Sequence, residues 1–320
     1  MKLFDLHCDT IYECCETGKH LRENDLHINY AAARRYQPYV QFFALFCGAR
    51  QPYSPETRDC LLDTPADKRF DRMLTTARRE FAANADWLTF CRSAADIRAA
   101  VEAGKAAALL SIEGAELLPD RPDALDYVYD AGVRLITLTW NYRSRYGCSS
   151  AVGQNEGLTE LGKQLVRDCG EKGILVDVSH LSDRGFRDVC EATDRPFVAT
   201  HSDSRVLCRN SRNLTDEQFA EIANRRGLVG VNLYTPFLVR QSDSVIDDAI
   251  DHIERFIGMH GEKVVALGCD FDGCDTLPIG IDGLADMYRL ADRMLTLGYK
   301  QETVDGLFYD NAFNFMQKML

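Results

Sequence analysis

The first ten residues carry one histidine and two aspartates in a short motif, Asp5-Leu6-His7-Cys8-Asp9-Thr10. Further acidic and imidazole side chains each end a short apolar run, and these are Glu113, His180, His201 and Asp270. Side chains alternate between the two faces of a β-strand, so we expect His7 and Asp9 to point the same way. Imidazole and carboxylate groups together suit a borderline divalent cation such as Zn²⁺. The residue types therefore predict a metal site at the ends of strands.

The number of these side chains bears on how many ions they hold. They are six groups, more than one tetrahedral zinc ion needs. A binuclear site fits better, with two ions about 3.5–4 Å apart that share a carboxylate. Each residue alone has a common structural explanation, because buried histidines are usually satisfied within the core and strand-end carboxylates often cap helices. Their occurrence at the same end of several strands favours the metal site.

Some other titratable residues lie near this set or resemble it. Glu116 and Asp272 are ambiguous neighbours, and Asp272 shares a face with Asp270 but lies beyond the expected end of its strand. The remaining histidines fall in expected helices or loops, and these are His20, His27, His252 and His260. We interpret these four as surface residues.

Eight segments have the character of β-strands, rich in Val, Ile, Leu and Ala without clear alternation. This composition is typical of strands buried on both faces of a parallel sheet. The segments are Leu3–Asp9, Val40–Cys47, Ala106–Glu113, Arg134–Trp140, Ile174–His180, Phe197–His201, Leu228–Tyr234 and Val264–Asp270. Helical patterns fall between them, over Leu158–Cys169, Asp183–Cys190, Thr215–Ala223, Asp243–Ile257 and Leu284–Leu297. This alternation predicts an α/β fold, a single (β/α)8 TIM-type barrel.

We expect one domain over residues 1–320, because no Pro/Gly/Ser-rich linker or longer repeat divides the chain. The segment from about Gln51 to Asp86 is long, charged and helix-prone, and is interpreted as an insertion after the second strand. A helix over Gln301–Gln317 is expected to close the barrel. Active sites of such barrels lie at the C-terminal ends of the strands, so the six groups should meet on one rim.

Composition limits the partners of the protein. The net charge of −12 argues against nucleic acid or an anionic membrane as a partner. No apolar run reaches the roughly 20 residues of a spanning helix, and no signal peptide is visible. The 12 cysteines are scattered without metal-finger spacing, which favours reduced thiols in a cytoplasmic protein. A homodimer is possible, although no heptad or exposed apolar stripe marks an interface.

Several motifs together carry a family resemblance across nearly the whole chain. They are Asp-Leu-His-Cys-Asp-Thr (5–10), Ser-Ile-Glu-Gly-Ala-Glu (111–116), Leu-Thr-Trp-Asn (138–141), Val-Asp-Val-Ser-His-Leu-Ser (176–182), Ser-Arg-Asn-Leu (211–214) and Gly-Cys-Asp-Phe-Asp-Gly (268–273). The chain resembles the membrane (renal) dipeptidase family, zinc peptidases of the amidohydrolase superfamily. The resemblance implies a hydrolase that cleaves free dipeptides, including those with a C-terminal D-residue.

The resemblance also implies a role for each motif residue. His7, Asp9 and Glu113 would bind one zinc ion, and Glu113, His180 and His201 the second, so that Glu113 bridges two ions per chain. A hydroxide between the ions would attack the scissile carbonyl, and Asp270 would transfer the proton to the leaving amine. Arg212 would hold the terminal carboxylate of the dipeptide, and Tyr234 would contact the substrate. A surface ion pair is the alternative for Arg212, since Arg205, Arg209, Asp203 and Asp216 lie near it in sequence.

Two features separate this chain from relatives within the superfamily. Many relatives begin with His-x-His and bridge their metals through a modified lysine, whereas this chain has His-x-Asp and no lysine in Arg134–Trp140. Mammalian family members also carry a histidine at the position of Trp140. In having Trp140 there, this chain resembles the microbial branch. Asn141, Arg143 or Arg145 would then contact the developing oxyanion, or the metals would suffice.

Two alternative functions remain open at this point. The same metals could hydrolyse another small amide, such as an N-acyl amino acid or a β-lactam. A non-catalytic binding protein that retains the barrel is the other alternative. The intact ligand set and Asp270 argue against it.

Overall fold

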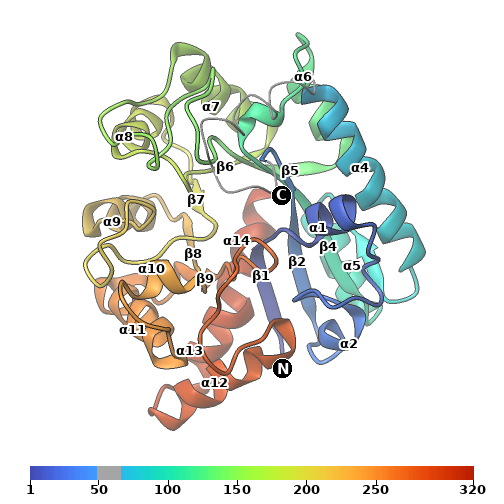
Figure 1. The fold of residues 1–320 in the computed structure, drawn as a ribbon, viewed down its shortest axis with the longest axis vertical. Helices are drawn as coiled ribbons and strands as arrows, with labels where there is room; N and C mark the ends of the chain where they lie inside the picture. Colours follow the sequence, from blue (N-terminus) through green and yellow to red (C-terminus); the bar gives the residue numbers. More distant parts are fainter. Residues whose placement is uncertain (49–65) are drawn as a thin grey trace.

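The computed structural model describes residues 1–48 and 66–320, and in it the eight predicted strands all form. They are β1 (Leu3–Cys8), β2 (Tyr39–Phe46), β4 (Ala106–Glu113), β5 (Val133–Thr137), β6 (Leu175–Asp177), β7 (Val198–Ala199), β8 (Leu228–Val231) and β9 (Val265–Leu267). All neighbours pair in parallel, and the pairs β1–β2, β2–β4 and β1–β9 close the ring (Figure 1). The (β/α)8 prediction is therefore confirmed.

One further strand, β3 (Leu88–Phe90), was not predicted from the sequence. It pairs with Ala106–Ala108 of β4, and β5 pairs with the later residues Leu110–Glu113. The two strands thus divide the length of β4 between them. A segment of three residues gives too short a hydrophobic pattern to be recognised in the sequence.

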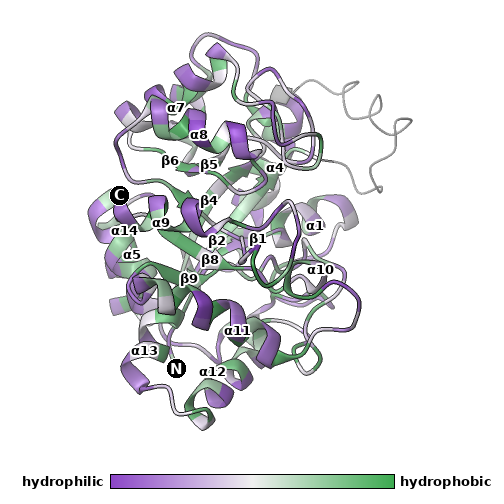
Figure 2. Ribbon diagram, turned by 90° about the vertical axis from the view of Figure 1, so that its left-hand side faces the viewer, coloured by the Kyte–Doolittle hydropathy of each residue, from purple (hydrophilic) through white to green (hydrophobic). Residues whose placement is uncertain are grey.

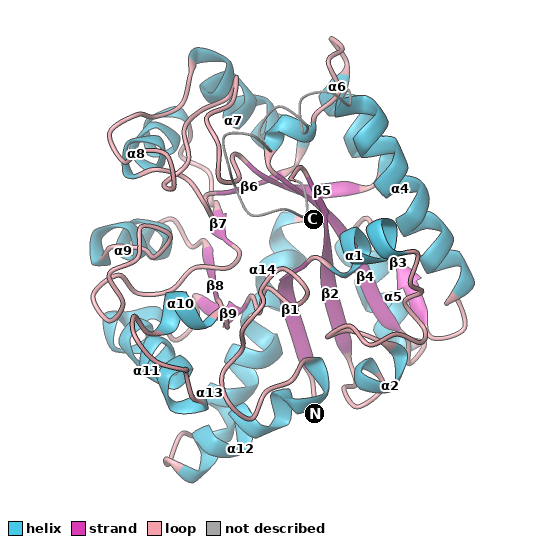
Figure 3. Ribbon diagram, viewed as in Figure 1, coloured by secondary structure: helices cyan, strands magenta, loops and turns pink. Residues whose placement is uncertain are grey.

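Helices follow the strands and surround the barrel (Figure 3). The predicted ones form as α7 (Glu160–Lys172), α8 (Asp183–Ala192), α9 (Asp216–Asn224), α11 (Ile246–Phe256) and α12 (Met287–Thr296). Thr215 caps α9: its hydroxyl accepts a hydrogen bond from the backbone N–H of Gln218, and its own backbone N–H donates one to the side-chain oxygen of Gln218. Gly173 ends α7 with a φ of 79°, a left-handed conformation that glycine adopts without a steric penalty.

The expected insertion over residues 51–86 is described only in part. Its later part forms α4 (Ala66–Ala83), an 18-residue helix that packs against α1 (Thr10–Thr17) and β2. This agrees with the helix-prone composition of the segment. Residues 49–65 lie outside the described residues.

The C-terminal helix closes the bottom of the barrel. The expected helix over residues 301–317 forms as α13 (Gln301–Asp305), a wider turn and then α14 (Asn311–Met319). Phe315 and Met316 of α14 join one buried cluster with Phe4, Val40 and Leu109 from the strands. Figure 1 shows α14 behind the centre of the strand ring. The N-terminal end of the barrel is thus filled by side chains, which leaves chemistry to the opposite end.

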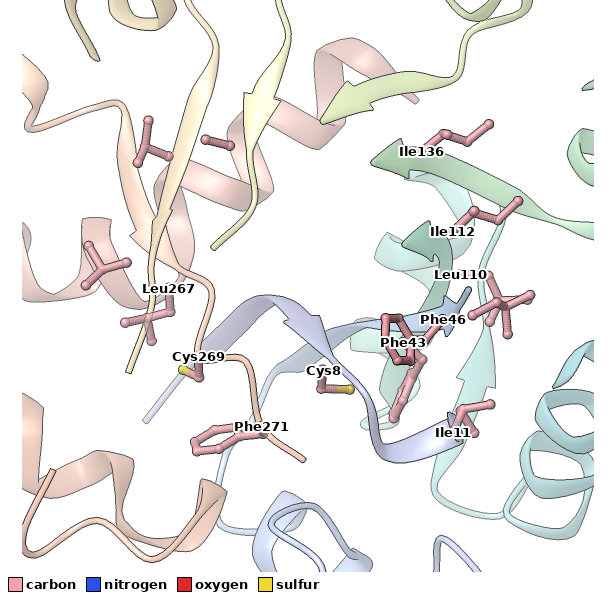
Figure 4. Close-up of a cluster of buried hydrophobic side chains, with 14 of the residues drawn as sticks. Cys8, Ile11, Phe43, Phe46, Leu110, Ile112, Ile136, Leu267, Cys269 and Phe271 are labelled. Carbon is pink, nitrogen blue, oxygen red and sulfur yellow. The ribbon is translucent and has the colours of Figure 1, made fainter. Parts of the chain in front are cut away.

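The other faces of the strands pack against the surrounding helices. Figure 4 shows part of this layer, including Phe43, Leu110, Ile112 and Leu267, which belong to the largest buried cluster. Figure 2 shows hydrophobic strands inside a shell of helices whose outer faces are hydrophilic. Burial on both faces explains why the strands read as continuous apolar runs.

β1 is irregular at the point where it carries the first candidate ligand, His7. Its pairing with β2 shifts register between Asp5 and Cys8. The carboxylate oxygen Oδ1 of Asp5 accepts hydrogen bonds from the backbone N–H groups of Cys269 (2.8 Å) and His7 (3.4 Å). Bulges redirect side chains and are common next to active sites. We infer that Asp5 stabilises the irregular backbone that presents His7.

Two findings bear on the surroundings of the protein. The eleven described cysteines are all free, and nine of them are buried. None of the helices formed by the described residues is both long and apolar enough to cross a membrane.

Candidate active site

The six predicted groups meet at the C-terminal end of the barrel. His7 lies in β1, Asp9 directly after it, and Glu113 is the last residue of β4. His180, His201 and Asp270 lie in loops just beyond β6, β7 and β9, because these strands end earlier than predicted. All six side chains are buried. The expected convergence on one rim is therefore present.

Two of these loop residues have unusual backbone conformations. His180 and Asp270 have φ values of 67° and 60°, in the left-handed region that non-glycine residues rarely occupy. Such strain costs about 1–3 kcal/mol per residue and is concentrated at functional sites. The tertiary structure maintains it at two residues of this cluster.

The two oxygens of Glu113 face different histidines. Oε2 lies 3.6 Å from His7 Nε2, whereas Oε1 lies 2.9 Å from His180 Nε2 and 3.7 Å from His201 Nε2. His7 Nε2 also lies 3.4 Å from Asp9 Oδ2. Glu113 therefore stands between one group formed by His7 and Asp9 and another formed by His180 and His201.

Asp270, which was expected to transfer a proton, also lies close to the candidate metal ligands. Its Oδ1 is 3.6 Å from His7 Nε2. Two sets of side chains have ligand atoms near enough to share an ion: His7, Glu113 and His201, and His7, Asp9 and Asp270. His7 belongs to both sets. Asp270 is thus placed either to hold an ion or to exchange a proton beside one.

The hydrogen bonds of His180 and His201 indicate the tautomer of each ring. In both rings Nε2 is the nitrogen that faces the cluster. His180 Nδ1 lies 2.9 Å from Asn141 Oδ1, which can only accept, so Nδ1 carries the proton. His201 Nδ1 lies 2.7 Å from the hydroxyl of Thr200. The two Nε2 atoms face each other at 2.9 Å, with Glu113 Oε1 beside them. Lone pairs arranged in this way repel each other unless a cation lies among them.

The polar atoms that lack partners agree with this interpretation. Neither ring nitrogen of His7 has a hydrogen-bond partner among the described residues, and the same holds for Asp9 Oδ1. Buried polar atoms are otherwise nearly always paired. Imidazole nitrogens together with carboxylates form a donor set that zinc accepts. The residues present therefore fit one or more divalent cations.

Burial and mutual repulsion shift the acid–base properties of the cluster. Burial, reinforced by the charge of Asp9, raises the pKa of Glu113 to about 8. Burial opposes protonation of His7, but the charges of Glu113 and Asp9 outweigh it and raise its pKa well above the usual value. Burial lowers the pKa of His180 and of His201 well below the usual value. Without metal, the cluster therefore holds protons near neutral pH.

Arg212 is a buried cation rather than a member of a surface ion pair. Its side chain reaches the carbonyl oxygen of His201 at 3.3 Å, and its Nε has no hydrogen-bond partner. Within the described residues no carboxylate forms an ion pair with it. Arg205, which the alternative included, pairs with Asp183 instead. An unpaired buried guanidinium is suited to binding an anion.

Tyr234 and Arg212 both contact the aromatic ring of Phe237. The guanidinium of Arg212 lies 5.2 Å from the centre of the Phe237 ring, and Tyr234 contacts the same ring edge-to-face at 5.0 Å. Tyr234 precedes α10 (Thr235–Leu238), since β8 ends earlier than predicted. Burial, followed by the neighbouring Asp275, raises the pKa of Tyr234 to about 12. Its hydroxyl therefore stays protonated near neutral pH.

Each of the three candidates for an oxyanion contact already has a partner in this structure. Asn141 accepts a hydrogen bond from His180 through Oδ1, and Arg143 pairs with Glu156 at the surface. Arg145 pairs with Asp120 at 2.7 Å. Trp140 lies 6.3 Å from the His180 ring, ring centre to ring centre. Of the three, Asn141 alone touches the cluster directly.

Two of the four histidines interpreted as surface residues are not on the surface, which corrects that prediction. His252 is 1% exposed and bonds the backbone of Ser204 and Leu238. His27 is partly buried and exchanges hydrogen bonds with Asp272, whose Oδ2 also accepts one from Thr10. Both histidines hold loops next to the site. His20 and His260 are exposed, as expected.

The two ambiguous acids have different positions. Asp272 ties the loop after β9 to the loop around His27 through the contacts above. Glu116 is partly exposed, but its carboxylate oxygens are buried beside Cys47, and this burial raises its pKa to about 7. Neither belongs to the sets of side chains that could share an ion.

Asn232, Thr200 and Asp177 were not predicted from the sequence. Asn232 donates a hydrogen bond to Asp270 Oδ2 at 3.0 Å, and Thr200 links His201 to Asp177. Asn232 and Asp177 each lie in a predicted strand segment, and Thr200 precedes His201 directly. Adjacency to the candidate ligands was the available signal.

Comparison with known proteins agrees with this geometry. The family model for membrane dipeptidase (peptidase family M19) matches residues 1–319. An uncharacterised protein from the pqqA 5′ region of Klebsiella pneumoniae is 35% identical over 250 residues, covering 75% of this chain and 92% of that protein. An uncharacterised dipeptidase of Schizosaccharomyces pombe is 31% identical over 312 residues, covering 92% and 73%.

Solved structures give the same relationship. A metallopeptidase of Rhodobacter sphaeroides, liganded with a phosphinate mimic of the dipeptide L-Ala-D-Ala, superposes with a TM-score of 0.89 at 26% identity, over 100% of this chain and 99% of that one. The M19 metallopeptidase named dipeptidase AC has a TM-score of 0.88 at 27% identity, with coverage of 100% and 99%. The chain therefore belongs to the membrane dipeptidase family, peptidase family M19, and is a metallodipeptidase.

Proposed function

We propose that this protein is a binuclear zinc dipeptidase that hydrolyses free dipeptides, including those with a C-terminal D-residue. The observation that carries the proposal is the position of Glu113, whose two oxygens face His7 on one side and His180 on the other. A carboxylate shared in this way suits two cations. The proposed ligands are His7, Asp9 and Glu113 for one ion and Glu113, His180 and His201 for the other.

The chain's own residues have separate tasks in this proposal. Bound zinc supplies Lewis acidity, which polarises a carbonyl and makes water acidic near neutral pH. Asp270 holds the proton at Oδ1 and delivers it to the leaving amine, since its Oδ2 is occupied by Asn232. Glu113 would contribute to catalysis by binding both ions and so fixing their positions relative to each other. Asn141 fixes the orientation of His180 beside the substrate.

Selection for dipeptides is proposed to depend on Arg212. Its guanidinium is buried next to the metal cluster through the carbonyl of His201. A free carboxylate two residues from the substrate N-terminus would reach it, whereas a longer peptide would leave this charge unpaired. The dipeptide mimic bound by the Rhodobacter sphaeroides relative supports a ligand of this size.

The experiment that tests the function uses metal-stripped protein. Hydrolysis of L,L- and L,D-dipeptides, tripeptides, N-acyl amino acids and a β-lactam is measured with and without added Zn²⁺. We expect zinc-dependent cleavage of dipeptides alone and two zinc ions bound per chain. Glu113→Gln, which removes the shared carboxylate, should abolish both zinc binding and cleavage. Cleavage of the acylated amino acids or the β-lactam in place of dipeptides would favour the alternative hydrolase.

The setting of the enzyme is also a proposal. Free, mostly buried thiols fit a reducing compartment, and we propose a cytoplasmic location. A homodimer stays a prediction that measurement of the mass in solution would test.

A further inference from the structure

The carboxylate of Asp177, the last residue of β6, is the centre of a buried hydrogen-bond network next to the cluster of candidate metal ligands. Its Oδ1 accepts hydrogen bonds from the backbone N–H groups of Ser179 (3.0 Å) and Thr200 (2.9 Å). Its Oδ2 accepts from the hydroxyl groups of Thr137 and Thr200, both at 2.7 Å. Asp177 is 0% exposed, so protein donors replace water at both oxygens. An ionised carboxylate can accept four such bonds.

The hydroxyl of Thr200 connects this carboxylate with His201. A hydroxyl has one proton and two acceptor sites, and the proton of Thr200 is directed to Asp177. The oxygen of Thr200 therefore accepts from His201 Nδ1, 2.7 Å away. His201 then carries its proton on Nδ1 and keeps a lone pair on Nε2, which lies 3.7 Å from Glu113 Oε1. This is the tautomer in which Nε2 can bind a metal.

Close backbone packing fixes the place of Thr200. A Cβ atom on Gly230 would lie 2.0 Å from the carbonyl oxygen of Thr200, and one on Gly268 would lie 1.7 Å from it. The strand segments around β8 and β9 can approach Thr200 only because both residues are glycines. Thr200 is 0% exposed. Its hydroxyl is therefore held between Asp177 and His201.

We propose that Asp177 and Thr200 form a positioning relay that holds His201 in its metal-binding tautomer. The inference rests on the proposed role of His201 as a zinc ligand. Partners of this kind orient metal-ligating histidines, and their loss typically weakens metal binding by 10- to 100-fold. Neither Asp177 nor Thr200 needs to touch the substrate. The relay is formed by the last residue of β6 and the residue directly after β7.

The test compares two substitutions that remove equivalent bonds. Thr200→Val removes the hydroxyl that bonds both Asp177 and His201. Thr137→Val removes a hydrogen bond of the same length to the same oxygen but does not touch His201. Zinc affinity is measured by competition with a chelator, the absorption spectrum of the Co²⁺-substituted protein is recorded, and unfolding is followed for both variants.

We expect Thr200→Val to lower the affinity for one of the two zinc ions by about 10- to 100-fold and to change the absorption spectrum of the Co²⁺-substituted protein. Thr137→Val should lower stability to a similar degree and leave both metal readouts unchanged. Thr200→Ser, which restores the hydroxyl, should recover the affinity. Equal weakening by both valine substitutions, or by neither, would overturn the relay.

A second measurement does not depend on Thr200→Val being folded. Asp177→Asn places an amide beside Thr200, which can donate to Thr200 and release its proton toward His201 Nδ1. We expect the ¹⁵N NMR signals of the metal-free His201 ring to change from the Nδ1–H to the Nε2–H form. An unchanged tautomer would overturn the proposal. A wild-type chain that binds no zinc would overturn the proposed function as well, whereas zinc binding insensitive to Thr200→Val overturns the relay alone.

Discussion

The side-chain amide of Asn232 donates a hydrogen bond of 3.0 Å to Oδ2 of Asp270. Asn232 is itself held on both sides, since its Oδ1 accepts from the backbone of Tyr234 and its backbone N–H donates to Asp203. The bond leaves Oδ1 of Asp270 directed to His7. The orientation of the proposed proton carrier is thus determined by a residue of the segment after β8.

Replacement of Asn232 by Asp tests this relationship with little change in shape. The acceptor for Tyr234 is kept, but the donor to Asp270 becomes a second negative oxygen. We expect kcat to fall by about 10- to 100-fold, because Asp270 loses the donor that orients its carboxylate. Zinc content should stay at the wild-type value. An unchanged kcat would contradict the assigned role of Asn232.

Arg212→Lys tests recognition of the substrate carboxylate. Lysine keeps the charge but loses the two-pronged guanidinium, so we expect KM for dipeptides to rise by about 10- to 100-fold with a smaller effect on kcat. Hydrolysis of a dipeptide amide, which lacks the carboxylate, should be equally slow in both proteins. The control is Arg209→Lys, an exposed arginine of the same loop. A similar KM increase in the control would contradict specific recognition.

Gly273 tests how tightly the loop after β9 packs on the cluster. A Cβ atom at this position would lie 2.2 Å from Asp9 Oδ2 and 2.4 Å from Asp270 Oδ1. We therefore expect Gly273→Ala to displace one carboxylate and lower zinc affinity by at least about 10-fold, measured by chelator competition. Gly258→Ala is the matched control, because no atom lies within 4 Å of its added Cβ. Wild-type zinc affinity in Gly273→Ala would contradict this prediction, because it would mean that the loop moves without displacing either carboxylate.

The pH dependence of zinc binding follows from the protonated cluster. The pKa of Glu113 is about 8, because burial and the charge of Asp9 favour its neutral form. The metal binds the ionised form, so zinc displaces a proton and its affinity falls as pH decreases below 8. We expect about a tenfold loss per pH unit for each proton released between pH 8 and pH 6. Calorimetry in buffers of different ionisation enthalpy measures this proton release, and a pH-independent affinity would contradict it.

The sequence alone was sufficient for the barrel and for the ligand candidates. Strands buried on both faces read as apolar runs, and His7, Glu113 and His201 each follow or end such a run. Because all parallel strands of a barrel end on one rim, the convergence of these groups followed from their positions in the chain. The boundaries of β6, β7 and β9 were less predictable, since the short segments that follow these strands are buried like the strands themselves.

Only the tertiary structure determined how each group is oriented and what holds it there. The irregular backbone at Asp5, the left-handed backbone of His180 and the buried state of His252 depend on contacts between residues distant in sequence. The bond of Asp177 to Thr137 joins two strands, and that of Asn232 to Asp270 joins the segments that follow two others. Sequence patterns report which face of an element is buried. Hydrogen-bond partners across a barrel depend on register and packing, which no local pattern encodes.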